Sequence, residues 1–169
     1  MKKFELTNEF ITNMFGTKLF RIRALVEFGD VEAGELGGYV EKESNLGHDD
    51  NAWVYGDAQV SGDARVYDNA RVYGDAWVYG NARVCGDALV CGDARVCGNG
   101  DYAYAHGFGS VNRTTTFFRL KDGGVGVRCG CFYGTLAQFR DKIRETHGET
   151  KKAQEYLMLA DLMKLRFEK

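Results

Sequence analysis

The sequence contains no proline among its 169 residues, although it contains 22 glycines. This combination excludes a collagen-like chain and a proline-rich linker, and it indicates a regular structure that needs positive φ angles at many positions. No run of about 18 apolar residues occurs that could cross a membrane as a helix. Positive charge is not in excess, because 24 Asp and Glu residues outnumber 22 Lys and Arg residues and give a net charge of −2. We therefore expect neither a membrane protein nor a general nucleic-acid binder.

Cysteine is also scarce, and the five cysteines form an odd set. The first residues, Met1 to Glu5, lack an apolar signal segment. Together these features predict free thiols and a cytoplasmic location. Hydrophobic residues make up 44% of the sequence, which is enough for a packed core.

A six-residue repeat dominates the centre of the sequence. Between residues 51 and 99 the pattern Ala-x-Val recurs without interruption, and each unit is followed by a pair drawn from Gly, Asp and Asn. The repeated valines are Val54, Val60, Val66, Val72, Val78, Val84, Val90 and Val96. In an extended segment Ala and Val point to one side, and the following pair tolerates the left-handed backbone angles of a tight turn. Three sides of this kind close a triangle of about 18 residues per coil, which predicts a parallel β-solenoid with valine inside.

This repeat resembles that of the hexapeptide-repeat proteins, which fold as left-handed parallel β-helices. More narrowly, three parts of the chain resemble small phage and prophage proteins of that kind. They are residues 20–40 with Phe-Arg-Ile-Arg-Ala-Leu at their start, the Val-Tyr-Gly-Asp-Ala array, and Cys-Gly-Cys-Phe at 129–132 followed by Gly-Thr-Leu at 134–136. The resemblance implies a left-handed winding and a homo-oligomer, with a trimer favoured.

The predicted fold is an all-β solenoid closed by a small C-terminal β-hairpin and a two-helix cap. Residues 1–36 are expected to form an N-terminal cap, 37–106 the solenoid, and 113–169 a C-terminal α+β module with 12 basic and 7 acidic residues. Because Leu46 and Val54 are eight residues apart, a two-residue insertion is expected in one corner. Within the C-terminal module, residues 114–120 and 125–132 predict the hairpin, and Thr135 with Gln138 forms a capping-box signature before a helix.

Stacking of every third repeat unit assigns the outward side chains to three faces of the triangle. The first face carries large side chains that suit a subunit interface. The predicted interface residues are Trp53, Tyr55, Tyr73 and Leu89. Arginines beside aromatic rings suit an anionic ligand or a stacked base. The predicted ligand-binding residues are Arg65, Arg71, Arg83, Arg95, Trp77, Tyr67 and Tyr79.

The cysteines do not predict a metal site. Cys85, Cys91 and Cys97 follow one another at six-residue steps and therefore point from three different faces. Cys129 and Cys131 are expected on one side of a strand, but two sulfurs without a second ligand pair do not hold zinc. No metal and no other cofactor is expected.

Two classes of function fit these features, with a purely structural assembly module as a third. The first is a non-catalytic binding protein of phage type that interferes with a host defence system, either by sequestering a small anionic or nucleotide ligand or by blocking a host protein. The second, implied by the resemblance, is an acyl-CoA-dependent acyltransferase, in which His48 or His106 would be the general base. The uninterrupted array has no ejected loop that could carry a catalytic group, which favours the binding protein.

Overall fold

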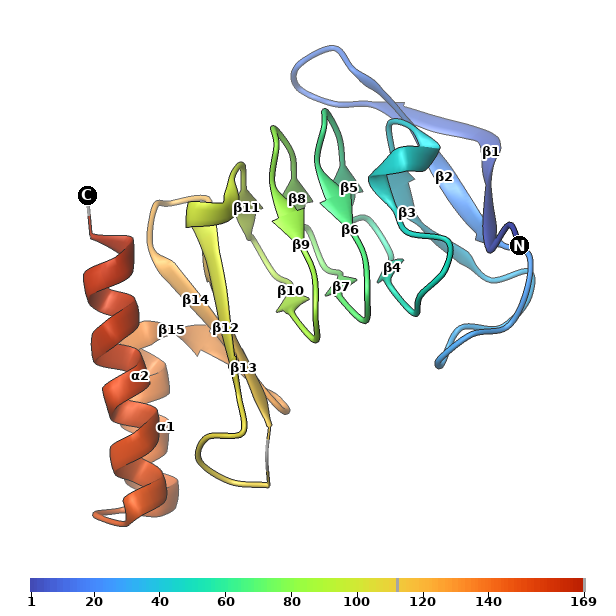
Figure 1. Cartoon of the computed structure of the whole chain (residues 1–169). Coiled ribbons are helices and arrows are strands. Elements are labelled where there is room, and N and C mark those ends of the chain that lie inside the picture. Colours follow the sequence, from blue (N-terminus) through green and yellow to red (C-terminus); the bar gives the residue numbers. More distant parts are fainter. Residues whose placement is uncertain (112, 169) are drawn as a thin grey trace.

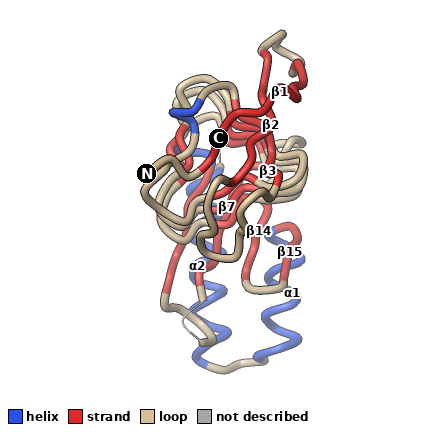
Figure 2. Tube along the Cα trace, turned by 90° about the vertical axis from the view of Figure 1, so that its right-hand side faces the viewer, coloured by secondary structure: helices blue, strands red, loops and turns tan. Residues whose placement is uncertain are grey.

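The computed structural model describes residues 1–111 and 113–168, and it consists of three consecutive parts (Figure 1). An N-terminal antiparallel region leads into a stack of short parallel strands, and a second antiparallel sheet with two helices follows. Figure 2, turned by 90°, shows the loops of successive turns overlying one another, while the helices extend to one side. The predicted β-solenoid with 18-residue coils, closed by an antiparallel sheet and two helices, is confirmed.

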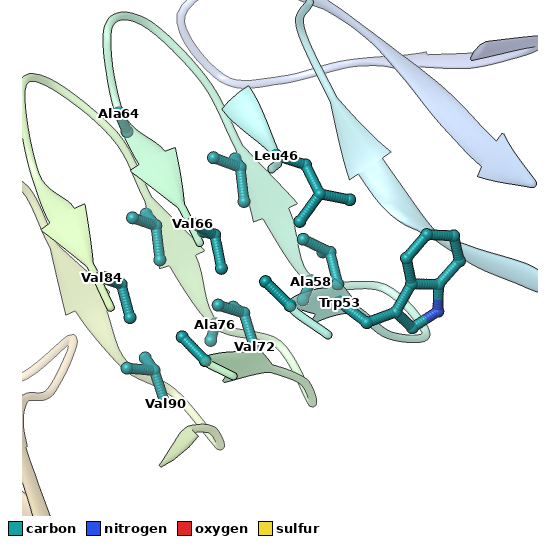
Figure 3. Packing of buried hydrophobic residues seen from close by; sticks show 14 of the residues in the cluster. Leu46, Trp53, Ala58, Ala64, Val66, Val72, Ala76, Val84 and Val90 are labelled. Atoms are coloured by element: carbon teal, nitrogen blue, oxygen red, sulfur yellow. The ribbon is translucent and has the colours of Figure 1, made fainter. Parts of the chain in front are cut away.

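The solenoid is built from two-residue strands that repeat every six residues. They are β4 (Trp53–Val54), β5 (Gln59–Val60), β6 (Arg65–Val66), β7 (Arg71–Val72), β8 (Trp77–Val78), β9 (Arg83–Val84), β10 (Leu89–Val90) and β11 (Arg95–Val96). Strands one coil apart pair in parallel, as Val60 does with Val78 and Val78 with Val96. All eight repeated valines, and the alanines two residues before them, have no exposed surface. Figure 3 shows several of these side chains, among them Val66, Val72, Val84 and Val90, gathered in the interior of the coils.

The corners of the coils depend on glycine where successive turns come close together. Gly74 has a φ of +69°, and a Cβ atom there would lie 2.8 Å from the backbone nitrogen of Gly92 in the next turn. A side chain at Gly74 would therefore be strained by both its backbone angle and its neighbour. One corner uses another residue instead, because Asp68 adopts a φ of +59°.

The predicted two-residue insertion is confirmed. Strand β3 (Leu36–Val40) pairs in parallel with β5, and Val40 lies beside Val60, twenty residues later. Leu46 likewise bridges to Val66, and it is buried. A short 3-10 helix, η1 (Glu43–Asn45), occupies this first, longer turn. Asn45 donates through its Nδ2 to the carbonyls of Gly62 and Ala64 and so ties the turn to the regular coils.

The N-terminal cap is a pair of antiparallel strands that continue one wall of the solenoid. Strand β1 (Phe4–Thr12) pairs with β2 (Lys18–Ala24), which pairs with β3. The N-terminal cap expected for residues 1–36 thus contains two strands that the repeat pattern does not reveal. One sheet thus runs from β1 through β3 to β11 in the order β1-β2-β3-β5-β8-β11.

The C-terminal cap is a four-stranded antiparallel sheet covered by two helices. Its strands are β12 (Tyr102–His106), β13 (Thr114–Arg119), β14 (Val125–Cys129) and β15 (Phe132–Thr135), and its helices are α1 (Leu136–His147) and α2 (Lys151–Phe167). A second 3-10 helix, η2 (Asn99–Asp101), connects it to the solenoid. The predicted hairpin is present as β13 and β14, and the capping box at Thr135 and Gln138 is confirmed.

Three details of this region differ from the sequence expectation. Residues 102–106 were expected to end the solenoid, but they pair antiparallel with β13 and so belong to the cap sheet. Tyr102 nevertheless closes the solenoid core, since its ring is 8% exposed. Cys129 and Cys131 were expected on one side of a strand, yet Gly130, with a φ of +58°, turns the chain between them. Cys129 is therefore buried and Cys131 is exposed.

Candidate functional site

The first face of the solenoid does not present all of the predicted interface residues. Trp53 was expected to point outward, but its side chain is completely buried. Phe28 and Phe4 from the N-terminal cap pack against its ring at centroid distances of 5.3 Å and 6.2 Å. The prediction of Trp53 as an interface residue is therefore wrong, because the period of the repeat carries no information about what the cap places over it.

The other residues of the first face line a groove between the two caps. Asp30 of the N-terminal region accepts hydrogen bonds from Arg71 at 3.0 Å and from the Tyr55 hydroxyl at 3.2 Å. Leu89 is half-buried, and its backbone N–H donates to the Thr116 hydroxyl of β13. Tyr55 and Tyr73 meet edge to face at 6.4 Å. Arg71 is thus held by an internal carboxylate, and the expected trimer through this face stays a prediction.

On the second face the predicted ligand residues contact one another and the N-terminal hairpin. The Arg95 guanidinium lies 4.1 Å from the centre of the Trp77 ring and donates to the carbonyls of Asp75 and Ala94. Phe15, in the turn between β1 and β2, packs against both Trp77 and Tyr79. These three side chains therefore hold the hairpin on the solenoid.

The third face brings together the remaining predicted residues. Arg65 and Arg83 are register partners on the parallel strands β6 and β9, so their Cα atoms are about 4.8 Å apart. Both side chains are exposed. Within residues 1–111 and 113–168, neither guanidinium has a hydrogen-bond or ion-pair partner. With Tyr67 they border a hollow of about 320 Å³, which is closed by residues 47–50 of the corner insertion.

His48 is held in this hollow by the N-terminal segment. Its ring stacks on Phe4 with the centroids 4.3 Å apart and the planes 11° from parallel. The backbone N–H of Lys3 donates to His48 Nδ1 at 3.2 Å, and Nε2 lies 3.8 Å from a carboxylate oxygen of Glu43. Because Nδ1 accepts a hydrogen bond, the proton of the neutral ring resides on Nε2.

The negative charge of Asp50 is balanced inside the protein, so it does not offset the positive charges of Arg65 and Arg83. Its carboxylate accepts hydrogen bonds from the Lys3 ammonium at 3.1 Å, from Ala52 N–H at 3.1 Å and from Asp68 N–H at 2.8 Å. Lys3 is only 3% exposed, and burial lowers the pKa of its ammonium despite the nearby carboxylate. Negative charge remains beside the hollow on Asp49, which is exposed, and on Glu43, whose carboxylate lies 3.8 Å from His48 Nε2.

Tyr67 connects the hollow to the interior of the stack. A hydrogen bond with Cys85, followed by burial, raises the pKa of the Tyr67 hydroxyl. The Cys85 sulfur also lies 3.7 Å from the Tyr102 hydroxyl. The tyrosine lines the same hollow as Arg65 and Arg83.

The structure places the two candidate histidines in different parts of the fold. His48 lies in the hollow, whereas His106 lies on β12 of the C-terminal cap and shares a hydrogen bond of 2.9 Å with the Thr114 hydroxyl. In the part of the chain that the structure describes, no group of three or more His, Cys, Asp or Glu side chains is arranged to hold a metal ion.

Sequence reasoning found the arginines, Tyr67 and His48, but it missed the residues that position the histidine. Lys3 and Phe4 come from the first strand region, more than forty residues before His48. Glu43 belongs to η1. The only signal that could have pointed to this site was the two-residue insertion, since an irregularity in a strict repeat marks a corner with a different shape.

Comparison with known protein families agrees with this architecture. A family model described as the YdcK β-solenoid repeat matches four overlapping stretches, residues 58–69, 64–80, 76–92 and 82–98. The chain is thus a β-solenoid repeat protein. Its central array consists of YdcK-type repeats that make about three turns. No curated protein matches the chain. Among the described helices, none has the length and apolar character needed to cross a membrane.

Proposed function

We propose that this protein is a binding protein that holds a small polyanion, of the phosphate or nucleotide class, in the hollow on its third face. The observation that carries the proposal is the pair of exposed side chains of Arg65 and Arg83, which are register partners on β6 and β9 and have no carboxylate partner among the described residues. Two arginines whose backbones are one strand spacing apart can reach neighbouring phosphate groups together, and each guanidinium can donate two parallel hydrogen bonds.

The other side chains of the hollow add donors and a flat ring. Tyr67 offers an aromatic surface of the kind on which a nucleobase stacks. His48 presents the N–H of Nε2, because Lys3 occupies Nδ1. Arginine, tyrosine and a histidine N–H together make a site that donates hydrogen bonds to an anion.

The geometry of His48 supports binding over acyl transfer. A general base must present a free lone pair to the proton that it removes. In the neutral ring the Nδ1 lone pair accepts the Lys3 N–H, and Nε2 carries a proton. His48 is therefore placed as a hydrogen-bond donor. The structure holds it there by stacking on Phe4 and by the proximity of Glu43.

The narrower hypothesis from the phage-type resemblance extends this proposal. A protein that withholds a nucleotide signal from a host would need a tight site for phosphates and a base, without turnover. Binding of a nucleotide in preference to inorganic phosphate would support that extension. Blocking of a host protein would instead depend on the basic C-terminal module, for example on Lys151 and Lys152.

Calorimetric titration with pyrophosphate and with ATP tests the proposed site. We expect binding by the native protein, and a loss of about 1–3 kcal/mol for each charged contact removed in the Arg65→Gln/Arg83→Gln variant. The matched control is Arg144→Gln/Lys151→Gln, which removes two positive charges from the exposed surfaces of α1 and α2. If both variants lose affinity equally, general charge rather than the third-face hollow accounts for binding, and the proposal fails.

A further inference from the structure

The outer surface of α2 carries three large apolar side chains that are mostly exposed and belong to neither hydrophobic core. Met158, Leu162 and Leu165 are 71%, 54% and 69% exposed. The buried side of the same helix is made by Ala153, Tyr156, Ala160, Met163 and Phe167, which pack on the cap sheet and α1. Helix α2 is thus apolar on two opposite sides, and only one of them is covered.

The spacing of the exposed side chains is that of a helix-pairing seam. They are separated by four and then three residues, which places them in one row along the helix. Such a row covers one narrow stripe, in contrast to the broader apolar face that packs onto a sheet. The outer surface of the neighbouring helix α1 is polar, so the stripe does not continue as a general apolar patch.

The two edges of the stripe carry opposite charges. On the side of α1, Asp161 forms an ion pair with Arg140, and Asp161 remains 71% exposed. On the side of β12, Arg166 donates to the backbone carbonyls of Asn99 and Tyr102. These contacts fix one carboxylate, shared with Arg140, on the acidic edge of the stripe and one guanidinium on its basic edge.

We propose that the stripe on α2 is the contact surface for the same helix of a second copy of this chain, with the two helices parallel about a two-fold axis. A two-fold axis along the helices sets the acidic edge of one copy against the basic edge of the other. Asp161 then faces Arg166 of the second copy, five residues further along, which is the spacing of charged pairs across parallel helices. An antiparallel pair would instead set acid against acid and base against base.

The position of α2 in the molecule permits this contact. Figure 1 shows both helices at the end of the molecule opposite the N-terminal strands, so the outer surface of α2 is the outermost layer of that end. A two-fold axis parallel to α2 joins two solenoids end to end, with their coils on opposite sides of the helix pair. Because one helix per copy forms the contact, the interface is small, and we expect a dimer that dissociates on dilution.

Sedimentation velocity over a wide concentration range tests the proposal. We expect a reversible monomer–dimer equilibrium for the native protein and its loss in Leu162→Glu, because the charge would lie at the centre of the seam. The control Tyr73→Glu alters the groove on the first face and should leave the dimer intact. A native protein that stays monomeric, a trimer, or a dimer abolished by Tyr73→Glu but not by Leu162→Glu overturns the proposal.

A crosslinking experiment tests the orientation of the helices without depending on the stability of Leu162→Glu. Met158→Cys is introduced after Cys97 and Cys131, the exposed cysteines, have been replaced by serine. Parallel helices bring residue 158 next to residue 158 of the second copy, so a short bismaleimide should join the two thiols efficiently. Antiparallel helices bring residue 158 next to residue 165. Efficient crosslinking only in a mixture of Met158→Cys and Leu165→Cys would therefore refute the parallel arrangement.

Discussion

Phe28 lies edge-on against Trp53, with the ring centroids 5.3 Å apart, and thereby covers an outward-pointing side chain of the solenoid. The Lys3 ammonium also contacts Phe28, at 4.6 Å from the centre of its ring. A residue of the repeat array has in this way become part of the core of the N-terminal cap. The cap is attached to the first turn by an aromatic contact as well as by strand pairing.

Replacing Trp53 should therefore weaken the whole protein. We expect Trp53→Ala to lower the free energy of unfolding by about 3–5 kcal/mol, the usual cost of removing a fully buried large aromatic side chain. Trp77→Ala should cost less, because Trp77 is only partly buried and packs against flexible side chains such as Arg95. Urea denaturation of both variants measures the difference, and equal losses would contradict the assignment of Trp53 to the core.

A charge inside the coils should unfold the array. Val78 is completely buried among other valines, so Val78→Asp leaves a carboxylate without a partner, at a cost of several kcal/mol. Gln59→Asp places the same side chain on the outside of the neighbouring turn and serves as the control. Circular dichroism should show loss of the folded state for the first variant and retention for the second. A folded Val78→Asp protein would be inconsistent with the solenoid core.

The two classes of glycine corner should differ in their tolerance of alanine. At Gly56, with a φ of +56°, a Cβ atom would meet no other atom within 4 Å, so only the backbone angle is strained. We expect Gly56→Ala to lose about 1–2 kcal/mol of stability. Gly74→Ala should lose more, since its Cβ would also approach Gly92 of the next turn. Thermal denaturation measures the loss of stability in both variants. Equal losses would contradict a contribution from the contact between Gly74 and Gly92.

Alkaline pH should lower the stability of the folded protein through the tyrosines of the first face. Burial raises the pKa of Tyr55 and that of Tyr73 to about 12 from the ordinary value of 10.0. The unfolded chain then loses these protons before the folded chain does, so the stabilisation is fully present below pH 10.0 and is lost as the pH rises toward about 12. Measured between those limits, the free energy of unfolding of Tyr73→Phe should fall less steeply with pH than that of the native protein. Identical slopes would show that Tyr73 ionises as readily in the folded state as in the unfolded one.

The sequence predicts a contact where both residues belong to the six-residue repeat, and it does not predict contacts with residues outside the repeat. The burial of Val54 and its equivalents, and the stacking of Arg65 beside Arg83, follow from a coil made of three repeat units. The cover over Trp53 does not, because Phe28 and Phe4 lie outside the array and reach it through the fold of the cap. No local pattern relates residues so distant in the sequence.

The same distinction applies to the candidate site. Arg65, Tyr67 and Arg83 could be assigned to one face by counting, and His48 could be assigned to a corner by the irregular spacing before Val54. The roles of the two His48 ring nitrogens could not be predicted, because they depend on Lys3 and Glu43. These contacts form only when the N-terminal strand folds back over the first turn.

The three walls of the solenoid differ in the extent of their backbone pairing. Among the described strands, one wall belongs to a sheet of six strands and another to a sheet of three, whereas on the third β6 pairs with β9 and with the single bridging residue Leu46, between η1 and η2. Local opening of a folded protein is least costly where the fewest neighbouring strands must separate. Amide protons of the third wall should therefore exchange with solvent earlier than those of the long sheet. A polyanion held between Arg65 and Arg83 would tie β6 and β9 together and slow that exchange, so ligand binding would reinforce a wall that is paired less extensively than the long sheet.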